Sequence, residues 1–275
     1  MHRDNLDIQF NNFKDELASY IFRLVTNKEQ TEDIVHDTYL KVVDKIDTFK
    51  GNASFKTWVF SIATNLSKNI LIKQNRWEVT AQDYGALLHV KSKAHWDAFQ
   101  QVFNSTPEQE YEVKEHLTYC FNCINKTLEI EQQVCLLLKE VYDFKVQEIM
   151  QITDLSEGKV KHAIANARKN LSDIFDSRCA FLNKNGVCHQ CTELTGILNS
   201  KQDAQQKANK LKIARQNNTH SKEKLFDIRL EIVRSINPLN SKNSLVTTYF
   251  LENSEKWVKE GKQKKILENP SETQS

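Results

Sequence analysis

Apolar residues recur along the N-terminal part of the chain at the three- and four-residue spacing of amphipathic helices. Three such stripes are visible: Phe10, Phe13, Leu17, Ile21 and Leu24; then Val35, Tyr39, Val42 and Ile46; and then Val59, Ile62, Leu66 and Ile70. Asn27 and Lys28 separate the first stripe from the second, and residues 49–54, with Gly51 as the flexible point, form a loop before the third. The three stripes predict three amphipathic helices, which pack into a compact helical domain over residues 10–76.

The rest of the chain divides into three further segments. Residues 77–107 lack a regular period and are expected to form a linker, whereas helical periodicity returns over residues 108–176 and predicts a second helical domain. Residues 177–275 form a C-terminal extension with one more amphipathic helix at 225–236. Six Gly and three Pro in 275 residues are too few for a many-stranded sheet. The expected fold is all-α, with an N-terminal helical bundle, a linker, a C-terminal helix-turn-helix domain and a helical, cysteine-bearing extension.

Residues 146–175 carry the pattern of the helix-turn-helix. A short helix is followed by a tight turn at 153–155, and Ser156 is a suitable N-cap for a longer second helix, with Glu157 near the positive end of its dipole. The apolar stripe of that helix is Val160, Ile164, Ala167, Leu171 and Ile174, which turns outward Lys159, His162, Asn166 and Lys169. Such a helix suits the major groove of DNA; the alternative is a hairpin of an ordinary bundle with a solvated charged face.

The net charge of +2 is unevenly distributed along the chain. Residues 50–76 contain no acid, and their cations are Lys50, Lys56, Lys68, Lys73 and Arg76. Residues 158–172 form a second acid-free stretch, with Lys159, Lys161, Arg168 and Lys169. Two separate basic faces predict two separate contacts with a polyanion such as nucleic acid.

Several short motifs lie together in residues 27–76. They are Glu32-Asp33 at the opening of a helix, Phe49-Lys50-Gly51, Ser54-Phe55-Lys56-Thr57-Trp58, and Ile62-Ala63-Thr64-Asn65-Leu66. On these motifs the segment resembles region two of the extracytoplasmic-function (ECF) sigma factors of the sigma-70 family, and the helix-turn-helix resembles their region four. The two regions cover nearly half of the chain in the family's order. The resemblance implies a DNA-binding transcription initiation factor, without catalytic activity, that binds core RNA polymerase and directs promoter recognition and melting.

The resemblance also implies roles for individual residues. Region two is expected to bind the melted minus-ten element through Lys50, Ser54, Phe55, Lys56, Thr57, Trp58, Asn65 and Lys68. For Trp58, packing that shapes the loop is favoured over direct stacking on a base. Region four is expected to bind the minus-thirty-five element through Ser156, Glu157, Lys159, Lys161, His162, Asn166, Arg168 and Lys169. The acid-rich helix is expected to dock on the largest polymerase subunit through Asp33, Asp37 and Lys41.

The chain departs from the family pattern at two points in the helix-turn-helix. Asp154 occupies the turn position where family members usually have Gly, and it is expected to adopt the left-handed conformation at modest strain. Ala163, Ala165 and Asn166 stand where the family usually carries more Arg. Fewer phosphate contacts predict weaker and less salt-dependent DNA binding by this domain in isolation.

The six cysteines fall into two groups. Cys120 and Cys135 lie beside apolar stripes and are expected to be buried, and the CxxC of Cys120 and Cys123 lies on a helix without the sheet that surrounds a redox motif. The second group is Cys179, Cys188 and Cys191, with His189 between the last two. It is a candidate zinc site, with redox-sensitive thiols or structural packing as alternatives. Some sigma factors of this class carry C-terminal extensions that replace a separate inhibitor, so residues 178–250 are interpreted as regulatory.

The remaining features limit partners and location. No apolar run is long enough for a membrane span and no secretory signal is visible, so a cytoplasmic protein with no membrane contact is expected. The expected partners are core RNA polymerase and promoter DNA, with an anti-sigma factor as a candidate, and no cofactor is required apart from the candidate zinc. The main alternative is a helix-turn-helix regulator that acts without forming a holoenzyme, although residues 10–76 are too short for a parallel-sheet receiver domain. No HExxH, phosphate-binding Gly loop or nucleophile elbow points to an enzyme.

Overall fold

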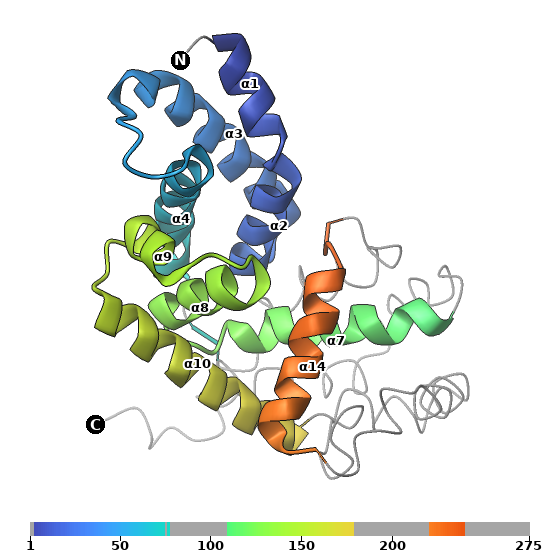
Figure 1. Cartoon of the computed structure of the whole chain (residues 1–275). Helices are drawn as coiled ribbons and strands as arrows, with labels where there is room; N and C mark the ends of the chain where they lie inside the picture. Colours follow the sequence, from blue (N-terminus) through green and yellow to red (C-terminus); the bar gives the residue numbers. More distant parts are fainter. Residues whose placement is uncertain (1–2, 75, 78–108, 179–219, 240–275) are drawn as a thin grey trace, which may run out of the picture.

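The computed structural model describes residues 3–74, 76–77, 109–178 and 220–239, and every regular element within these ranges is a helix (Figure 1). The N-terminal module consists of α1 (Arg3–Asn11), α2 (Lys14–Val25), α3 (Lys28–Lys45), the short turn η1 (Ile46–Thr48) and α4 (Phe55–Lys73). The prediction of an all-α fold is confirmed for the described residues. No described helix combines the length and apolar character needed to cross a membrane. The predicted linker lies, apart from residue 77, outside the described ranges.

The first apolar stripe forms two helices instead of one, and the break falls just before α2. Phe13 there has φ of −130° and ψ of 11°, which is not helical. The break lets the two phenylalanine rings, whose centroids stay 5.8 Å apart, reach different helices. Phe10 meets Tyr39 of α3 with 5.2 Å between ring centroids, whereas the ring of Phe13 lies 6.0 Å from that of Phe55 in α4. The expectation of one continuous helix over residues 10–24 was therefore wrong, because a single helix would hold both rings on one face.

Side-chain caps fix the points where α3 and α4 begin. Asn27 precedes α3, and its side-chain oxygen accepts a hydrogen bond from the Gln30 backbone N–H at 2.8 Å. Ser54 precedes α4, and its Oγ accepts from the Thr57 backbone N–H at 3.0 Å. The loop between the two helices passes through Gly51, whose φ of +73° lies in the left-handed region. The predicted loop is confirmed, and Gly51 provides its left-handed turn.

The second module consists of α7 (Gln109–Asn125), α8 (Ile130–Leu136), the π-helical turn η2 (Leu137–Val141), α9 (Val146–Thr153) and α10 (Glu157–Arg178). α9 and α10 form the predicted helix-turn-helix, and the turn passes through Asp154 with φ of +57°. The left-handed conformation expected at Asp154 is confirmed. Within α10, the side chains of Val160, Ala167 and Leu171 are buried, as the predicted apolar stripe requires.

One helix of the C-terminal extension is described, α14 (Lys222–Ser235), close to the helix predicted at 225–236. It packs across both α7 and α10, and Figure 1 shows it in orange. Its apolar face, with Phe226, Leu230 and Val233, is buried in the main core. The extension is thus joined to the second module by a packed helix.

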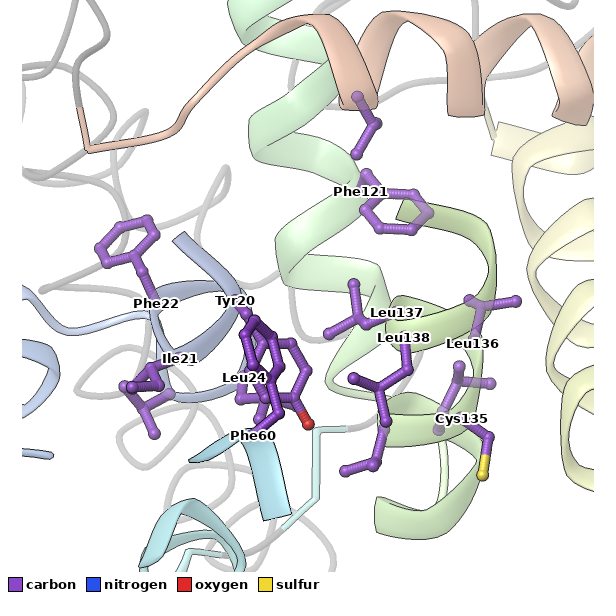
Figure 2. Packing of buried hydrophobic residues seen from close by; sticks show 14 of the residues in the cluster. Tyr20, Ile21, Phe22, Leu24, Phe60, Phe121, Cys135, Leu136, Leu137 and Leu138 are labelled. Atoms are coloured by element: carbon purple, nitrogen blue, oxygen red, sulfur yellow. The ribbon is translucent and has the colours of Figure 1, made fainter. Parts of the chain in front are cut away.

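The two modules share one hydrophobic core. α4 packs on α8 and α9, and α2 packs on η2, so that buried residues of both modules form a single cluster. Figure 2 shows Tyr20, Leu24 and Phe60 of the N-terminal module opposite Leu138 of the second module. Phe60 is completely buried, with its ring centroid 5.3 Å from that of Tyr20 and 4.8 Å from that of Phe144. The modules that the sequence separates by a linker are therefore packed against each other.

Candidate nucleic-acid and polymerase interface

The outer face of α3 carries the charged residues predicted to contact polymerase. Asp33, Asp37 and Lys41 recur every four residues on this helix, and all three are exposed. The inner face of α3 packs into the core through Ile34, Thr38 and Val42. Leu40 is 50% exposed and adds an apolar position that sequence analysis missed. Its signal in the sequence was its place off the apolar stripe of α3, beside Lys41.

Three aromatic rings pack together where the loop meets α4. The ring centroids of Phe49 and Trp58 are 5.1 Å apart, and Phe55 lies 5.9 Å from Phe49 and 6.0 Å from Trp58. All three side chains are half-buried, so each retains an exposed part. This mutual packing favours the interpretation that Trp58 shapes the loop. Lys50 is exposed in the same loop.

Two of the predicted DNA-binding residues of α4 face other helices. Lys56 Nζ forms an ion pair with Glu16 Oε1 of α2 at 2.7 Å and lies 5.1 Å from the ring centroid of Phe144. Thr57 is 1% exposed, and its hydroxyl donates to Glu148 Oε1 of α9 at 3.3 Å. The other predicted residues differ in exposure: Ser54 and Asn65 are exposed, and Lys68 is half-buried. Of the predicted set, Ser54 and Asn65 are therefore open to solvent, whereas Lys56 and Thr57 lie where α4 packs on other parts of the protein.

Arg76 does not belong to a free basic face. Its Nε donates to the Leu128 carbonyl at 2.6 Å, and its Nη2 donates to Gln133 Oε1 at 2.6 Å. Burial lowers the pKa of Arg76 to about 10, although nearby Glu129 opposes the shift. Arg76 was predicted to be one of the polyanion-binding cations, whereas in the structure it joins the end of the N-terminal module to the second module.

The outer face of α10 presents most of the residues predicted for it. Ser156, Glu157, Lys159, Lys161, His162 and Lys169 are exposed, and Asn166 is half-buried. The Ser156 Oγ accepts from the Lys159 backbone N–H at 3.5 Å, which supports its predicted place as the N-cap. Lys161 pairs with Glu157 at 2.6 Å, a pair on the helix surface that solvent weakens. This face remains open to a nucleic-acid partner.

Arg168 has a different environment from the other cations of α10. Its Nη1 lies 2.9 Å from Glu140 Oε1, and its Nη2 donates to Asp227 Oδ1 at 2.5 Å. Its guanidinium carbon also lies 5.4 Å from the ring centroid of Phe226 in α14. Arg168 was predicted to contact DNA, but in this arrangement two acids distant in the sequence hold its guanidinium.

The cysteines described in the second module are thiols with buried side chains. Cys120, Cys123 and Cys135 are buried, as expected for the first and the last of them. Burial raises the pKa of the Cys135 thiol to about 12, so this thiol stays protonated at neutral pH. The candidate zinc ligands Cys179, Cys188, Cys191 and His189 lie outside the described residues. Within the described ranges, no group of three or more His, Cys, Asp or Glu side chains is arranged to hold a metal.

Known proteins resemble both modules. The family model of Sigma-70 region 2 matches residues 10–78, and that of Sigma-70, region 4 matches residues 123–171. RNA polymerase sigma factor YlaC of Bacillus subtilis (strain 168) is 25% identical over 170 residues, which span 62% of this chain and 91% of the relative. The ECF RNA polymerase sigma-E factor of Escherichia coli (strain K12) is 26% identical over 161 residues, which span 58% of this chain and 81% of the relative. The chain is an ECF sigma factor of the sigma-70 family.

In this sigma factor, the N-terminal module contains region 2 and the second module contains region 4. The region 4 match ends at residue 171, within α10, so α14 lies beyond both matched regions. A solved complex of the sigma factor RpoE with the anti-sigma factor NepR from Bartonella quintana aligns with a TM-score of 0.42 and 16% identity, covering 62% of this chain and 97% of that chain.

Replacing Ser54 with Ala is expected to destabilise region 2 of the sigma factor by about 1 kcal/mol, because α4 loses its N-cap. The Ser54 Oγ also lies 2.7 Å from Thr57 Oγ1, so both of these contacts are with the first turn of α4. Urea unfolding of the full chain measures the loss. Ser54→Asp, which keeps a capping oxygen, serves as the control and should retain most of the stability. Equal losses in both variants would contradict the capping role.

Proposed function

We propose that this sigma factor binds core RNA polymerase through α3 and recognises its promoter with two surfaces, one on region 2 and one on region 4. The observation that carries the proposal is the separation of exposed charge: acids on α3, and cations on the outer face of α10. An acidic helix suits a basic docking surface on a protein, and a cationic helix of a helix-turn-helix suits DNA. One chain with both can bring polymerase to a chosen site.

On region 2, the proposed contact is with the melted minus-ten strand. Lys50 and Asn65 are exposed near the start and along the length of α4, and the rings of Phe55 and Trp58 are half-exposed. Unstacked bases bind aromatic faces, and lysines neutralise the backbone phosphates between them. Together with Ser54, these residues are accessible to DNA in the present arrangement. Lys56, Thr57 and Lys68 complete the surface once the second module no longer covers α4.

On region 4, the proposed contact is with the duplex minus-thirty-five element. Lys159, Lys161 and Lys169 supply phosphate contacts, and His162 and Asn166 supply groups that hydrogen-bond to base edges. The side chains of His162 and Asn166 lie 3.3 Å apart, one turn from each other on the same face. Ser156 and Glu157 stand at the N-terminus of the helix, where DNA-reading helices make their first contacts.

The role consists of binding and positioning, so it requires neither a catalytic group nor a cofactor. We propose the cytoplasm as the location, because RNA polymerase transcribes there. The candidate zinc site at Cys179, Cys188 and Cys191 is a separate prediction about the extension.

The proposal is tested by mixing the full chain with purified core RNA polymerase and separating the complexes by gel filtration. A one-to-one complex is expected, and the same complex should start transcription at defined positions on sheared genomic DNA, mapped by sequencing RNA 5′ ends. Core polymerase alone is the control. DNA binding by the chain without a polymerase complex would favour the helix-turn-helix regulator and overturn the proposal.

A further inference from the structure

The two promoter surfaces cannot both work in the packed arrangement. Elements named minus-ten and minus-thirty-five are centred about 25 base pairs apart, or about 85 Å along B-form DNA. Regions 2 and 4 instead pack directly on each other, α4 against α9. Thr57, on the proposed strand-binding side of α4, is 1% exposed and bonded to Glu148 of α9. Promoter binding therefore requires α9 to leave α4.

α14 engages the promoter helix of region 4 with complementary charge. Asp227 of α14 holds Nη2 of Arg168 at 2.5 Å, and Glu140 of η2, within region 4 itself, holds Nη1 at 2.9 Å. Two carboxylates thus occupy the positions at which a DNA phosphate would meet this guanidinium. Two further ion pairs lie along α14: Lys222 with Asp173, and Arg234 with Glu140.

Between these ion pairs, α14 presents an apolar and aromatic face to region 4. Phe226 is 2% exposed, and its ring stacks on that of Phe175 of α10 with 6.3 Å between centroids. The guanidinium carbon of Arg229 lies 3.7 Å from the centroid of the same Phe175 ring. Leu230 and Val233 are also buried. Phe226, at the centre of this contact, is the side chain whose removal should release the helix.

The end of α14 reaches region 2 through Arg23 of α2, which is 1% exposed. The Nη2 of Arg23 donates to the carbonyl of Val233 at 2.8 Å and to that of Ile236 at 2.7 Å. These carbonyls belong to the C-terminal end of α14, where a helix leaves its carbonyls without intrahelical partners and attracts cations. From region 4 and α7, the Tyr142 hydroxyl accepts from Nε at 3.2 Å and Asn122 Oδ1 accepts from Nη1 at 3.0 Å.

This arrangement makes the docking of α14 and the closure of the two regions depend on each other. None of the four acceptors of Arg23 is a carboxylate, and burial lowers the pKa of the guanidinium. A buried cation without a counter-ion is tolerated only while its hydrogen bonds are complete. Removal of α14 takes away two of the four acceptors, so water must enter the junction between regions 2 and 4.

The other buried contacts between regions 2 and 4 are also more polar than those of a permanent hydrophobic core. Lys126 is 4% exposed, and its Nζ donates to Thr26 Oγ1 of the facing module at 2.8 Å. The buried amide nitrogen of Asn122, whose oxygen accepts from Arg23, has no hydrogen-bond partner in the described part of the chain. Such groups regain water when an interface opens, so opening costs less than it would in an apolar core.

We propose that α14 is an intramolecular latch that holds regions 2 and 4 closed, with Arg23 coupling its docking to their closure. In the latched chain, α9 covers the strand-binding side of α4, and Asp227 holds Arg168. The inference rests on the proposed function, because it concerns access to the two promoter surfaces. It assigns to residues 222–236 of this chain the work that a separate inhibitory partner would otherwise do.

The test uses the full chain and its Phe226→Asp variant, which places a charge in the aromatic contact of α14. Hydrogen exchange is measured in peptides from α14 and from the C-terminal half of α2. RNA yield is measured at the start sites mapped on genomic DNA, with purified core RNA polymerase and limiting sigma factor. Both peptides should exchange faster in the variant. RNA yield should rise about tenfold, because only open chains expose both promoter surfaces and the yield increases with their fraction. A misfolded variant cannot produce such a gain.

A matched pair of milder variants completes the test. Asp227→Asn and Glu231→Gln each remove one negative charge from α14, but Glu231 is exposed and Asp227 holds Arg168. Asp227→Asn should raise RNA yield about threefold, and Glu231→Gln should leave it unchanged. Faster exchange in α14 with unchanged α2 exchange and unchanged RNA yield would overturn the latch. Absence of core binding and of transcription in every chain would instead overturn the proposed function, since the α2 exchange reports on closure without polymerase.

Discussion

Asp33→Arg is expected to weaken binding to core RNA polymerase by about 100-fold, because an attractive contact with a basic docking surface becomes a repulsive one that costs several kcal/mol. The side chain of Asp33 is exposed on α3, so its replacement removes no contact within the hydrophobic core of the protein. The free energy of unfolding should therefore change by no more than about 0.5 kcal/mol. Anisotropy titration with core polymerase and urea unfolding give the two values.

Asp15→Arg is the matched control for this prediction. Asp15 is also an exposed acid on a helix of the N-terminal module, but it lies on α2, away from the residues assigned to the polymerase contact. The variant makes the same change of charge and should leave core affinity within about twofold of the wild type. Equal weakening by both variants would mean that net charge, and not the face of α3, determines docking.

Much of the fold could be predicted because its signals are local. Helical periodicity located α3, α4 and α14, and the caps at Asn27 and Ser54 act within three residues of their own positions. The left-handed turn at Asp154 is also local, since one short polar side chain allows it. The break at Phe13 could not be predicted, because it depends on which distant helices the neighbouring rings contact.

The candidate site shows the same division. The exposed faces of α3 and α10 follow from helical spacing, and the structure agrees with them. The environments of Thr57 and Arg168 depend on Glu148 and Asp227, which lie 91 and 59 residues away in the sequence. Arg23 gave a local signal, a cation inside an otherwise apolar run, but its acceptors come from three other parts of the chain. Contacts between modules, and not helix patterns, decide which predicted residues are accessible.

Phe60→Ala is expected to lower the free energy of unfolding of the full chain by about 3–5 kcal/mol, the usual loss when a fully buried phenylalanine is truncated. The ring of Phe60 is packed between Tyr20 of region 2 and Phe144 of the second module. Urea unfolding followed by circular dichroism measures the change. Ile72→Ala on the same helix is the control; Ile72 is 70% exposed, so its truncation should cost no more than about 0.5 kcal/mol.

The same residue can show whether the two modules are closed in solution. Phe144 is 4% exposed, and its ring lies 4.8 Å from that of Phe60, across the junction between α4 and the second module. In a closed chain, the losses caused by Phe60→Ala and Phe144→Ala should not add, and a double-mutant cycle should give a coupling of about 0.5–3 kcal/mol. In the Phe226→Asp background, where the latch is released, this coupling should fall toward zero. Coupling that persists unchanged would mean that the rings hold the modules together without α14.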